Sequence, residues 1–247
     1  MLKDFSKEQF DIVLQAGQSN SEGSGIGNAL KPFQPSEDIW YLNNDFTISK
    51  AQELVSGNNI VGNFSLSFAG EYANKGVLDK GRKLLIIRAA VGGTGFLDKR
   101  WGMQDDLFLR MMEMIKTALV LNSQNRLVTF LWHQGETDAI LKADYKTHYK
   151  NLSALINSVR YTFDCDKLPF LAADFVKQWK NDNYELCEPV VNAMQDICGS
   201  IGNAQFIDSE GLQSNDQKLG NGDTIHFCRE SLNQLGSLYF NAFCKIC

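Results

Sequence analysis

Short apolar runs alternate with longer stretches of helical periodicity along most of the chain. The runs end in glycine or in polar clusters, and the stretches between them repeat an apolar residue every three or four positions. This alternation is typical of βαβ units and predicts a parallel sheet covered by helices. The predicted strands are Ile12–Gln15, Lys83–Ala89, Leu127–Trp132, Phe170–Ala173 and Ala204–Ile207.

Two of the intervening stretches have an apolar stripe that predicts a one-sided helix. In the first, steps of four and three residues alternate, which keeps the stripe on one helix face. Its members are Tyr145, Tyr149, Leu152, Ile156, Val159 and Phe163. The second stripe consists of Leu107, Met111, Ile115, Ala118 and Leu119. We assign the large side chains of both stripes to core packing rather than to a cofactor site.

Residues 20–65 depart from this alternation. They are rich in Asn, Gly and Ser and contain one short apolar run, Ile39–Leu42. We expect a long excursion over the strand ends, a position where binding sites often lie. No internal repeat, low-complexity tract or Pro-rich linker divides the chain. We therefore predict one α/β domain over residues 1–247, with a five-stranded parallel sheet.

Composition and charge narrow the range of partners. With 24 Lys and Arg against 29 Asp and Glu, the net charge is −5, and no run of basic residues is present. Binding to nucleic acid or to an anionic membrane is therefore not expected. The longest apolar runs, such as Leu84–Ile87, are far shorter than the roughly 20 residues that span a bilayer. We predict a soluble protein, and the oligomeric state has no signal in the sequence.

The chain ends bear on location and metal binding. Met1–Phe10 has no uninterrupted apolar stretch of the kind found in a signal peptide, so we expect a cytoplasmic protein unless a leader was removed. The six cysteines all lie in the C-terminal half, which suits buried thiols in a reducing compartment. Cys244 and Cys247 form a CxxC. Because zinc would need two more ligands, we favour packing of a terminal helix for this pair.

Four polar segments are candidates for chemistry. Three follow predicted strands, and the fourth precedes the last predicted helix. In an open parallel sheet, ligands bind beyond the carboxyl ends of the strands. The segments are Gly17–Asn20, Val91–Gly95, His133–Asp138 and Asp223–His226. Together they supply the groups that acyl transfer through a serine requires: a nucleophile, a base, a group that orients the base, and donors for an oxyanion.

Ser19 is the candidate nucleophile because it follows an apolar strand and lies on a turn that begins with glycine. The alternative is a serine that only caps the following helix. His226 is the candidate base, since imidazole can accept a proton near neutral pH. Asp223, three residues earlier, can fold back to hold the other ring nitrogen. His133 is the competing base at a strand end, and His148 is expected on the helix surface.

The Gly92-Gly93 pair can bring a backbone N–H close to an oxyanion, because glycine has no side chain in the way. A simple strand-to-loop turn or a phosphate cradle would use the same residues. Neither GxxxxGK[ST] nor GxGxxG spacing is present, which argues against a nucleotide. Three rings near the second and third segments could either pack against a sugar or belong to the core. They are Phe96, Trp101 and Trp132.

In their order along the chain, the four segments resemble the SGNH hydrolases. The resemblance is to the branch that contains sialate O-acetylesterases and the acetyl xylan esterases of carbohydrate esterase family six. It rests on GQSN at Gly17–Asn20, the Gly92-Gly93 turn, WHQGETD at Trp132–Asp138 and DTIH at Asp223–His226. The likeness covers nearly the whole chain, including a segment at residues 62–76 that resembles the lead into the family's first long helix. Gln18 stands where the wider group usually has Asp, as in this branch.

The resemblance implies a flavodoxin-like three-layer α/β/α sandwich and a serine esterase. Ser19 would be the nucleophile, His226 the base and Asp223 its orienting partner. The backbone N–H groups of Ser19 and Gly93 and the amide of Gln134 would form the oxyanion hole. Residues that either support the site or contact substrate are Gln18, Asn20, His133, Glu136 and Trp101.

The implied reaction is hydrolysis of O-acetyl groups on sugars through an acetyl-serine, with no metal or cofactor. Acetylated xylo-oligosaccharides, sialic acid and related sugars are the expected substrates. Two alternatives keep the same site: an acyltransferase, or a general short-chain esterase. A third is a carbohydrate-binding protein without catalysis, against which the joint presence of Ser19, Asp223 and His226 counts.

Overall fold

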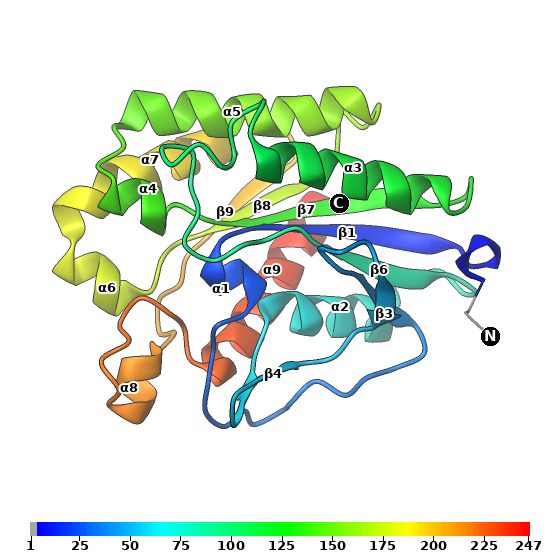
Figure 1. Ribbon diagram of the computed structural model, residues 1–247, viewed down its shortest axis with the longest axis horizontal. Helices are drawn as coiled ribbons and strands as arrows, with labels where there is room; N and C mark the ends of the chain where they lie inside the picture. Colours follow the sequence, from blue (N-terminus) through cyan, green and yellow to red (C-terminus); the bar gives the residue numbers. More distant parts are fainter. Residues whose placement is uncertain (1–3) are drawn as a thin grey trace.

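A computed structural model describes residues 4–247, so the first three residues of the segment used to predict location lie outside it. A twisted sheet runs through the molecule, with helices above and below it (Figure 1). It has seven strands in the order β3-β2-β6-β1-β7-β8-β9. The main-sheet strands are β1 (Phe10–Gly17), β2 (Ile39–Leu42), β3 (Ile48–Lys50), β6 (Lys83–Arg88), β7 (Arg126–His133), β8 (Phe170–Ala173) and β9 (Ala204–Ile207). A separate hairpin is made of β4 (Leu54–Ser56) and β5 (Asn59–Val61).

The five strands predicted from the sequence are all present and pair in parallel, as β1, β6, β7, β8 and β9. The predicted strand number was wrong, because β2 and β3 extend the sheet beyond β6. The apolar run Ile39–Leu42 is β2, a fully buried strand parallel to β6. At the sheet edge, β3 is antiparallel and mostly exposed, so its sequence lacks an apolar pattern.

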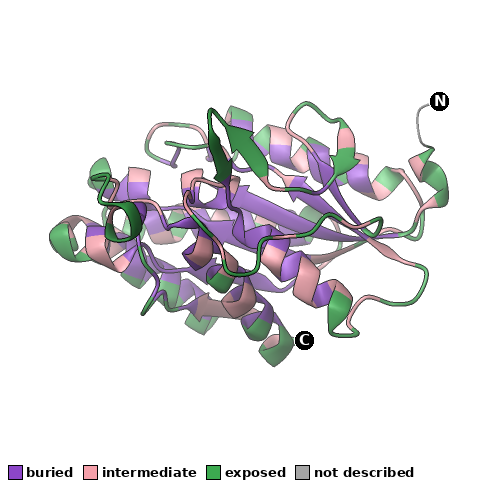
Figure 2. Cartoon of the chain, turned by 90° about the horizontal axis from the view of Figure 1, so that it is seen from below, coloured by how far each residue is buried: buried purple, intermediate pink, exposed green. Residues whose placement is uncertain are grey.

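The helices form two outer layers, which confirms the three-layer α/β/α architecture. They are η1 (Phe5–Lys7), α1 (Ser19–Glu22), α2 (Phe64–Asn74), α3 (Asp106–Val120), α4 (Glu136–Ile140), α5 (Tyr145–Thr162), α6 (Lys177–Asp182), α7 (Tyr184–Ser200), α8 (Asn215–Leu219) and α9 (Arg229–Ile246). In Figure 1, α3, α5 and α7 cover one face of the sheet, and α2 and α9 cover the other. Figure 2 shows the buried sheet enclosed by helices whose outer faces are exposed.

The two predicted apolar stripes fall on α3 and α5, but the α5 stripe is rotated relative to the prediction. Tyr145 and Tyr149 lie at the flank of α5, where their hydroxyls contact Asp196 and Ser200. His148 is 1% exposed, so its assignment to the surface was wrong. Four residues separate it from buried Leu152, and that spacing places both on the same helix face.

At the amino ends of the strands, one ion cluster ties the sheet together. Asp11 of β1 is fully buried and accepts hydrogen bonds from Arg82, Arg126 and the Tyr72 hydroxyl. Burial acts to raise the pKa of Asp11, but the two guanidinium groups and the hydroxyl outweigh it and hold that pKa below its usual value. This cluster lies at the opposite ends of the strands from the four candidate segments.

Among residues 4–247, no helix has the length and apolar character needed to cross a bilayer. The thiols of Cys187, Cys198 and Cys228 are buried, as expected. Cys244 and Cys247 are exposed, so the prediction that this pair packs within the terminal helix was wrong. In the described part of the chain, no three His, Cys, Asp or Glu side chains are grouped as a metal site.

Candidate active site

The first and third candidate segments meet because two neighbouring strands end together. Gly17 of β1 pairs with His133 of β7, and the N–H of Gln18 donates to the His133 carbonyl at 2.9 Å. Gly17 has a φ of 128°, and a Cβ there would lie 2.1 Å from the His133 carbonyl oxygen. Only glycine fits this approach. Ser19 therefore begins α1 directly beside the third segment.

Ser19, His226 and Asp223 form a hydrogen-bonded chain. The Ser19 Oγ lies 2.9 Å from Nε2 of His226, and Nδ1 of the same ring lies 2.9 Å and 3.0 Å from the two carboxylate oxygens of Asp223. The His226 and Asp223 side chains are 27% and 28% exposed, so the chain opens to solvent. Its order is that of a nucleophile, a base and an orienting acid.

Asn215 is a site residue that the sequence did not reveal. Its amide nitrogen donates to Oδ2 of Asp223 at 2.9 Å, and its backbone N–H donates to the His226 carbonyl at 2.8 Å. The same amide nitrogen reaches the Ser24 carbonyl at 3.0 Å, which joins α8 to the loop after α1. An Asn at the start of a short helix is too common to signal such a role.

Asn20 fastens the backbone on both sides of His226. Its amide nitrogen donates to the Ile225 carbonyl at 3.0 Å, and its amide oxygen accepts the Phe227 N–H at 3.0 Å. The second amide proton goes to Oε1 of Glu136 at 2.8 Å. The Phe227 N–H can only donate and the Ile225 carbonyl can only accept, so these two backbone groups fix which end of the Asn20 amide faces which partner.

Two buried groups behind Asn20 have displaced pKa values. Burial raises the pKa of Glu136, although the hydrogen bond from Asn20 acts to lower it. Burial lowers the pKa of His133 to about 3, so this ring is neutral at physiological pH. Its 3.7 Å approach to Glu136 is therefore not an ion pair. His133 is fully buried, which removes it as a competitor to His226 for the Ser19 proton.

Gln18 joins the first segment to the third. Its side chain is 2% exposed, and its Oε1 accepts the Thr137 N–H at 3.1 Å and, more weakly, the Gly135 N–H at 3.4 Å. Gly135 and Thr137 flank the first residue of α4. Gln18, Asn20, His133 and Glu136 are all buried, so they support the site rather than line an accessible surface.

The second segment packs against Ser19 and carries an N–H group without a partner among the described residues. A Cβ at Gly92 would lie 3.5 Å from the Cβ of Ser19, so this loop packs against the serine. The Gly92 N–H donates to Oε2 of Glu22 at 2.7 Å and is occupied. Within residues 4–247, neither the Ser19 N–H nor the Gly93 N–H donates a hydrogen bond. Gly93 has a φ of 68°, a conformation that favours glycine.

Gln134 is buried beside the same loop. Its amide nitrogen donates to Oδ2 of Asp138 at 2.8 Å and contacts the Thr94 carbonyl at a long 3.4 Å. The Gln134 amide oxygen is buried and has no hydrogen-bond partner among the described residues. One amide proton is thus firmly committed to Asp138, and the other is held weakly.

A family model described as carbohydrate esterase, sialic acid-specific acetylesterase, matches residues 9–245. The chain belongs to this acetylesterase family. Membership identifies the protein as a carboxylic ester hydrolase of the carbohydrate esterase type. Among the curated proteins, none matches the sequence.

Solved structures share the acetylesterase fold. A protein from Arabidopsis thaliana aligns with a TM-score of 0.77 and 20% identity over 96% of this chain and 99% of its own. NanS aligns with a TM-score of 0.77 and 17% identity over 96% and 97%. A carbohydrate acetylesterase from Xanthomonas citri aligns with a TM-score of 0.61 and 16% identity over 96% of this chain and 56% of its own. At these identities the likeness establishes the fold.

The three aromatic rings near the second and third segments are buried in this acetylesterase. Trp101 and Trp132 are fully buried and Phe96 is 6% exposed. The Trp101 indole N–H donates to Oγ1 of Thr94 at 2.9 Å, and its ring meets that of Trp132 edge to face. Of the two alternatives that the sequence leaves open, burial therefore favours the core for these three rings. Trp101 instead supports the loop that carries Gly93.

The raised pKa of Glu136 gives the acetylesterase a testable pH dependence of stability. An acid whose pKa is higher in the folded state than its unfolded value of about 4.3 costs stability as pH rises through that interval. Glu136→Gln cannot ionise, so it avoids this cost. We expect the free energy of unfolding of Glu136→Gln, relative to wild type, to increase from pH 4.5 upward in urea titrations.

Glu113→Gln is the matched control, because Glu113 is exposed on α3. Because its side chain is exposed, it lacks the burial that acts on Glu136, so its difference from wild type should not show the rise expected for Glu136→Gln. A Glu136→Gln difference that is constant, or that shrinks as pH rises, would contradict a raised pKa at this position.

Proposed function

We propose that the protein removes O-acetyl groups from sugars through an acetyl-serine intermediate on Ser19. The observation that carries this proposal is the chain of 2.9 Å contacts that links Ser19 Oγ to Nε2 of His226 and Nδ1 of His226 to Asp223. With Asp223 accepting the proton on Nδ1, the free lone pair of His226 lies on Nε2 and faces the serine.

In the first step, His226 Nε2 takes the Ser19 proton while Oγ attacks the acetyl carbonyl carbon. The carbonyl oxygen becomes an oxyanion. When the tetrahedral intermediate collapses, the bond from the acetyl carbon to the sugar oxygen breaks. The sugar oxygen takes the proton from His226, and the acetyl group remains on Ser19.

The unoccupied N–H groups of Ser19 and Gly93 would donate to the oxyanion. Gln134 is the third donor. Its proton toward Thr94 is held at only 3.4 Å, so a stronger acceptor in the site can take it. Catalytic hydrogen bonds often tighten only when substrate is bound. Gly92 is excluded as a donor because Glu22 already accepts its N–H.

In the second step, water gives a proton to His226 and attacks the acetyl carbon, and the bond to Ser19 Oγ breaks. Oγ regains its proton from His226, and acetate leaves. These residues supply the nucleophile, the proton transfers and the oxyanion donors, so we propose that neither metal nor cofactor takes part.

For substrate we propose acetylated sugars, including sialic acids and xylo-oligosaccharides. The family description names sialic acid, and one structural neighbour is a carbohydrate acetylesterase. The finer choice among these sugars depends on contacts beyond the acetyl group.

The test measures acetate release from a panel of O-acetyl sialic acids, acetylated xylo-oligosaccharides and aryl acetate, in the presence of a chelator. Rapid acid quench during turnover of aryl acetate, followed by mass spectrometry, should find one acetyl group on the peptide that contains Ser19. Sugar binding without acetate release would favour a binding protein. Acetyl transfer to a second sugar in preference to water would favour an acyltransferase, and faster turnover of long acyl chains a general esterase.

A further inference from the structure

We propose that Asp138 is a positioning residue that sets the oxyanion donors of this site. Its carboxylate holds both the loop that carries Gly93 and the amide of Gln134. The inference rests on the proposed function, because it assigns a role within the same reaction. Asp138 lies on α4, is fully buried, and is a motif residue to which the mechanism above gives no task.

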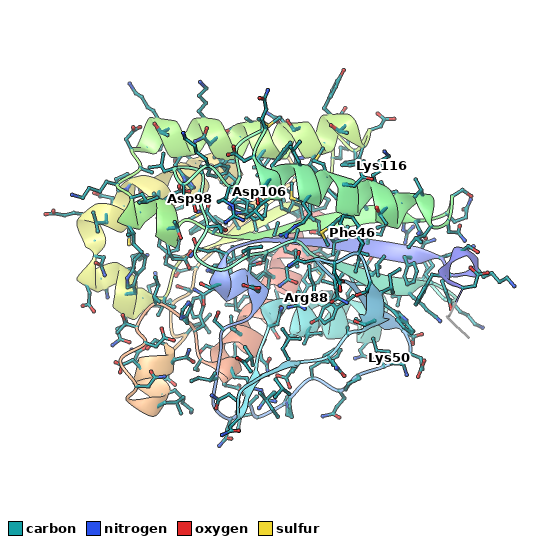
Figure 3. All side chains as sticks on the ribbon, in the orientation of Figure 1. Phe46, Lys50, Arg88, Asp98, Asp106 and Lys116 are labelled. Atoms are coloured by element: carbon teal, nitrogen blue, oxygen red, sulfur yellow. The ribbon has the colours of Figure 1, made fainter. Side chains whose placement is uncertain are left out.

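The first contact is with the loop after β6. Oδ1 of Asp138 accepts the Phe96 N–H and the Leu97 N–H, each at 2.9 Å. Two successive N–H groups on one carboxylate oxygen fix the path of the backbone at that point. Figure 3 shows Asp98, the next residue of this loop, on the side of the sheet that carries α3.

Gly95 shows how closely the loop and the carboxylate fit. A Cβ at this residue would lie 2.7 Å from Oδ1 of Asp138 and 2.9 Å from its Cγ. Any larger side chain must displace either the carboxylate or the loop. The Gly95 N–H donates to Oδ1 of Asp98 at 2.9 Å, which adds a turn just before the two N–H groups bound by Asp138.

Gly93 lies between two carboxylate anchors. On one side, Glu22 accepts the Gly92 N–H at 2.7 Å, and on the other, Asp138 accepts those of Phe96 and Leu97. Between the anchors, the Thr94 hydroxyl donates to the Val91 carbonyl at 2.7 Å. The direction of the Gly93 N–H is therefore fixed before substrate arrives, which is the condition for effective oxyanion stabilisation.

The second contact decides the orientation of Gln134. An amide has a donor end and an acceptor end of similar shape, and an ionised carboxylate can only accept. Oδ2 of Asp138 therefore selects the Gln134 nitrogen, at 2.8 Å. The second proton of that nitrogen points to the Thr94 side, where the loop carrying Gly93 passes. Without an ionised Asp138, the amide can turn over and present its oxygen there.

The surroundings of Asp138 favour its ionised form. Nδ1 of buried His148 lies 3.4 Å from Oδ2, and no other His, Lys or Arg is paired with this carboxylate among the described residues. Burial acts to raise the pKa of Asp138, but His148, the Leu97 N–H and Gln134 together hold it below its usual value. On the loop that Asp138 holds, burial and the negative charge of Asp138 raise the pKa of Asp98.

The experiment is Asp138→Asn. The Asn amide has one acceptor end and one donor end. When its oxygen accepts the loop N–H groups, its NH₂ group faces Gln134. Gln134 then turns its own amide oxygen to that side, which is also the side of the site. We expect kcat for acetyl esters to fall roughly 100- to 1000-fold, the usual cost of losing an oxyanion donor, with a much smaller change in KM. Asp11→Asn is the matched control, because Asp11 is equally buried with several donors but lies at the amino end of β1, the end opposite to the site.

A second readout separates positioning from general loosening of the fold. In an aryl thionoacetate, sulfur replaces the carbonyl oxygen and is a poor partner for oxyanion donors. Wild type should therefore prefer the aryl acetate, and Asp138→Asn should reduce this preference. Asp11→Asn should lower the Tm but keep the ester-to-thionoester ratio of wild type. A ratio unchanged in a folded Asp138→Asn protein would overturn the proposal.

Two further variants cover the remaining outcomes. If Asp138→Asn does not fold, Gly95→Ala displaces the intact carboxylate and should lower both kcat and the ester preference. Wild-type values in Gly95→Ala would contradict the proposal. If Asp138 acts partly through Gln134, the losses of Asp138→Asn and Gln134→Ala should not add in the double variant. Failure of the proposed function would show separately, as turnover that survives removal of Ser19.

Discussion

Ser19→Ala is expected to lower kcat for every acetyl ester by at least about 10,000-fold, while the protein stays folded. Alanine has no oxygen that can form the acetyl intermediate, so only the oxyanion donors and substrate binding would remain to accelerate hydrolysis. Ser19 is the first residue of α1 and only its Oγ contacts His226, so alanine fits the same backbone. Acetate release and thermal unfolding measure the two effects.

Ser153→Ala, on α5, is the matched control, and its kcat should equal that of wild type. Turnover by Ser19→Ala within tenfold of wild type, at an unchanged Tm, would refute the serine mechanism. In that case acetyl groups should also be absent from the Ser19 peptide after rapid quench of the wild-type reaction.

Asp223→Asn is expected to lower kcat by about 10,000-fold, because it forces His226 into the wrong tautomer. Asn215 donates its amide proton to Oδ2 at 2.9 Å, so the amide oxygen of the new Asn takes that position. Its NH₂ group then takes the place of Oδ1, 2.9 Å from Nδ1 of His226, and this contact is a hydrogen bond only when Nδ1 accepts. The ring proton moves to Nε2, and the ring can no longer take the proton of Ser19.

The tautomer can be observed directly. Nitrogen-15 chemical shifts of His226 should report protonation on Nδ1 in wild type and on Nε2 in Asp223→Asn. Asp196→Asn is the control, since Asp196 on α7 contacts only the Tyr145 hydroxyl among the described side chains. It should keep the wild-type kcat. An Asp223→Asn protein with Nδ1 still protonated and wild-type turnover would remove Asp223 from the mechanism.

Asp138→Asn and Asp223→Asn therefore affect different parts of the same reaction. Loss of Asp223 disables the base, so esters and thionoesters should slow together. Loss of Asp138 disturbs the oxyanion donors, so esters should slow more. The comparison assigns the two carboxylates to proton transfer and to oxyanion stabilisation through kinetics alone.

The sequence predicted the central strands well because parallel strands buried on both faces are continuous apolar runs. Strands β6 and β8 have such runs, and their ends agree closely with the prediction. Edge strand β9 is only partly buried and carries Gln205, yet its flanking polar residues still gave its bounds. Strand β3 was not predicted because an exposed edge strand needs no apolar face. Buried β2 was not predicted as a strand because its run of four apolar residues, Ile39–Leu42, is isolated within a polar segment.

His148 shows why burial is harder to predict than helix formation. The spacing of apolar residues predicts the helix α5, but the same sequence predicts that the His148 ring faces water. In the structure its ring packs against Phe96 edge to face and approaches Asp138, a partner from α4. A buried polar side chain is stabilised by contacts that other elements provide, and these contacts have no local signal.

By itself the sequence determined which residue types stand at the carboxyl ends of the strands and before the last helix, and so the candidate roles of Ser19, Asp223 and His226. Only the tertiary structure decided how these side chains are held. Asn215 binds Asp223, and the Asn20 amide spans the backbone around His226, a contact over more than 200 residues of sequence. Chemistry follows from side-chain type and local turns, whereas orientation depends on hydrogen bonds between distant segments that meet only when the sheet closes.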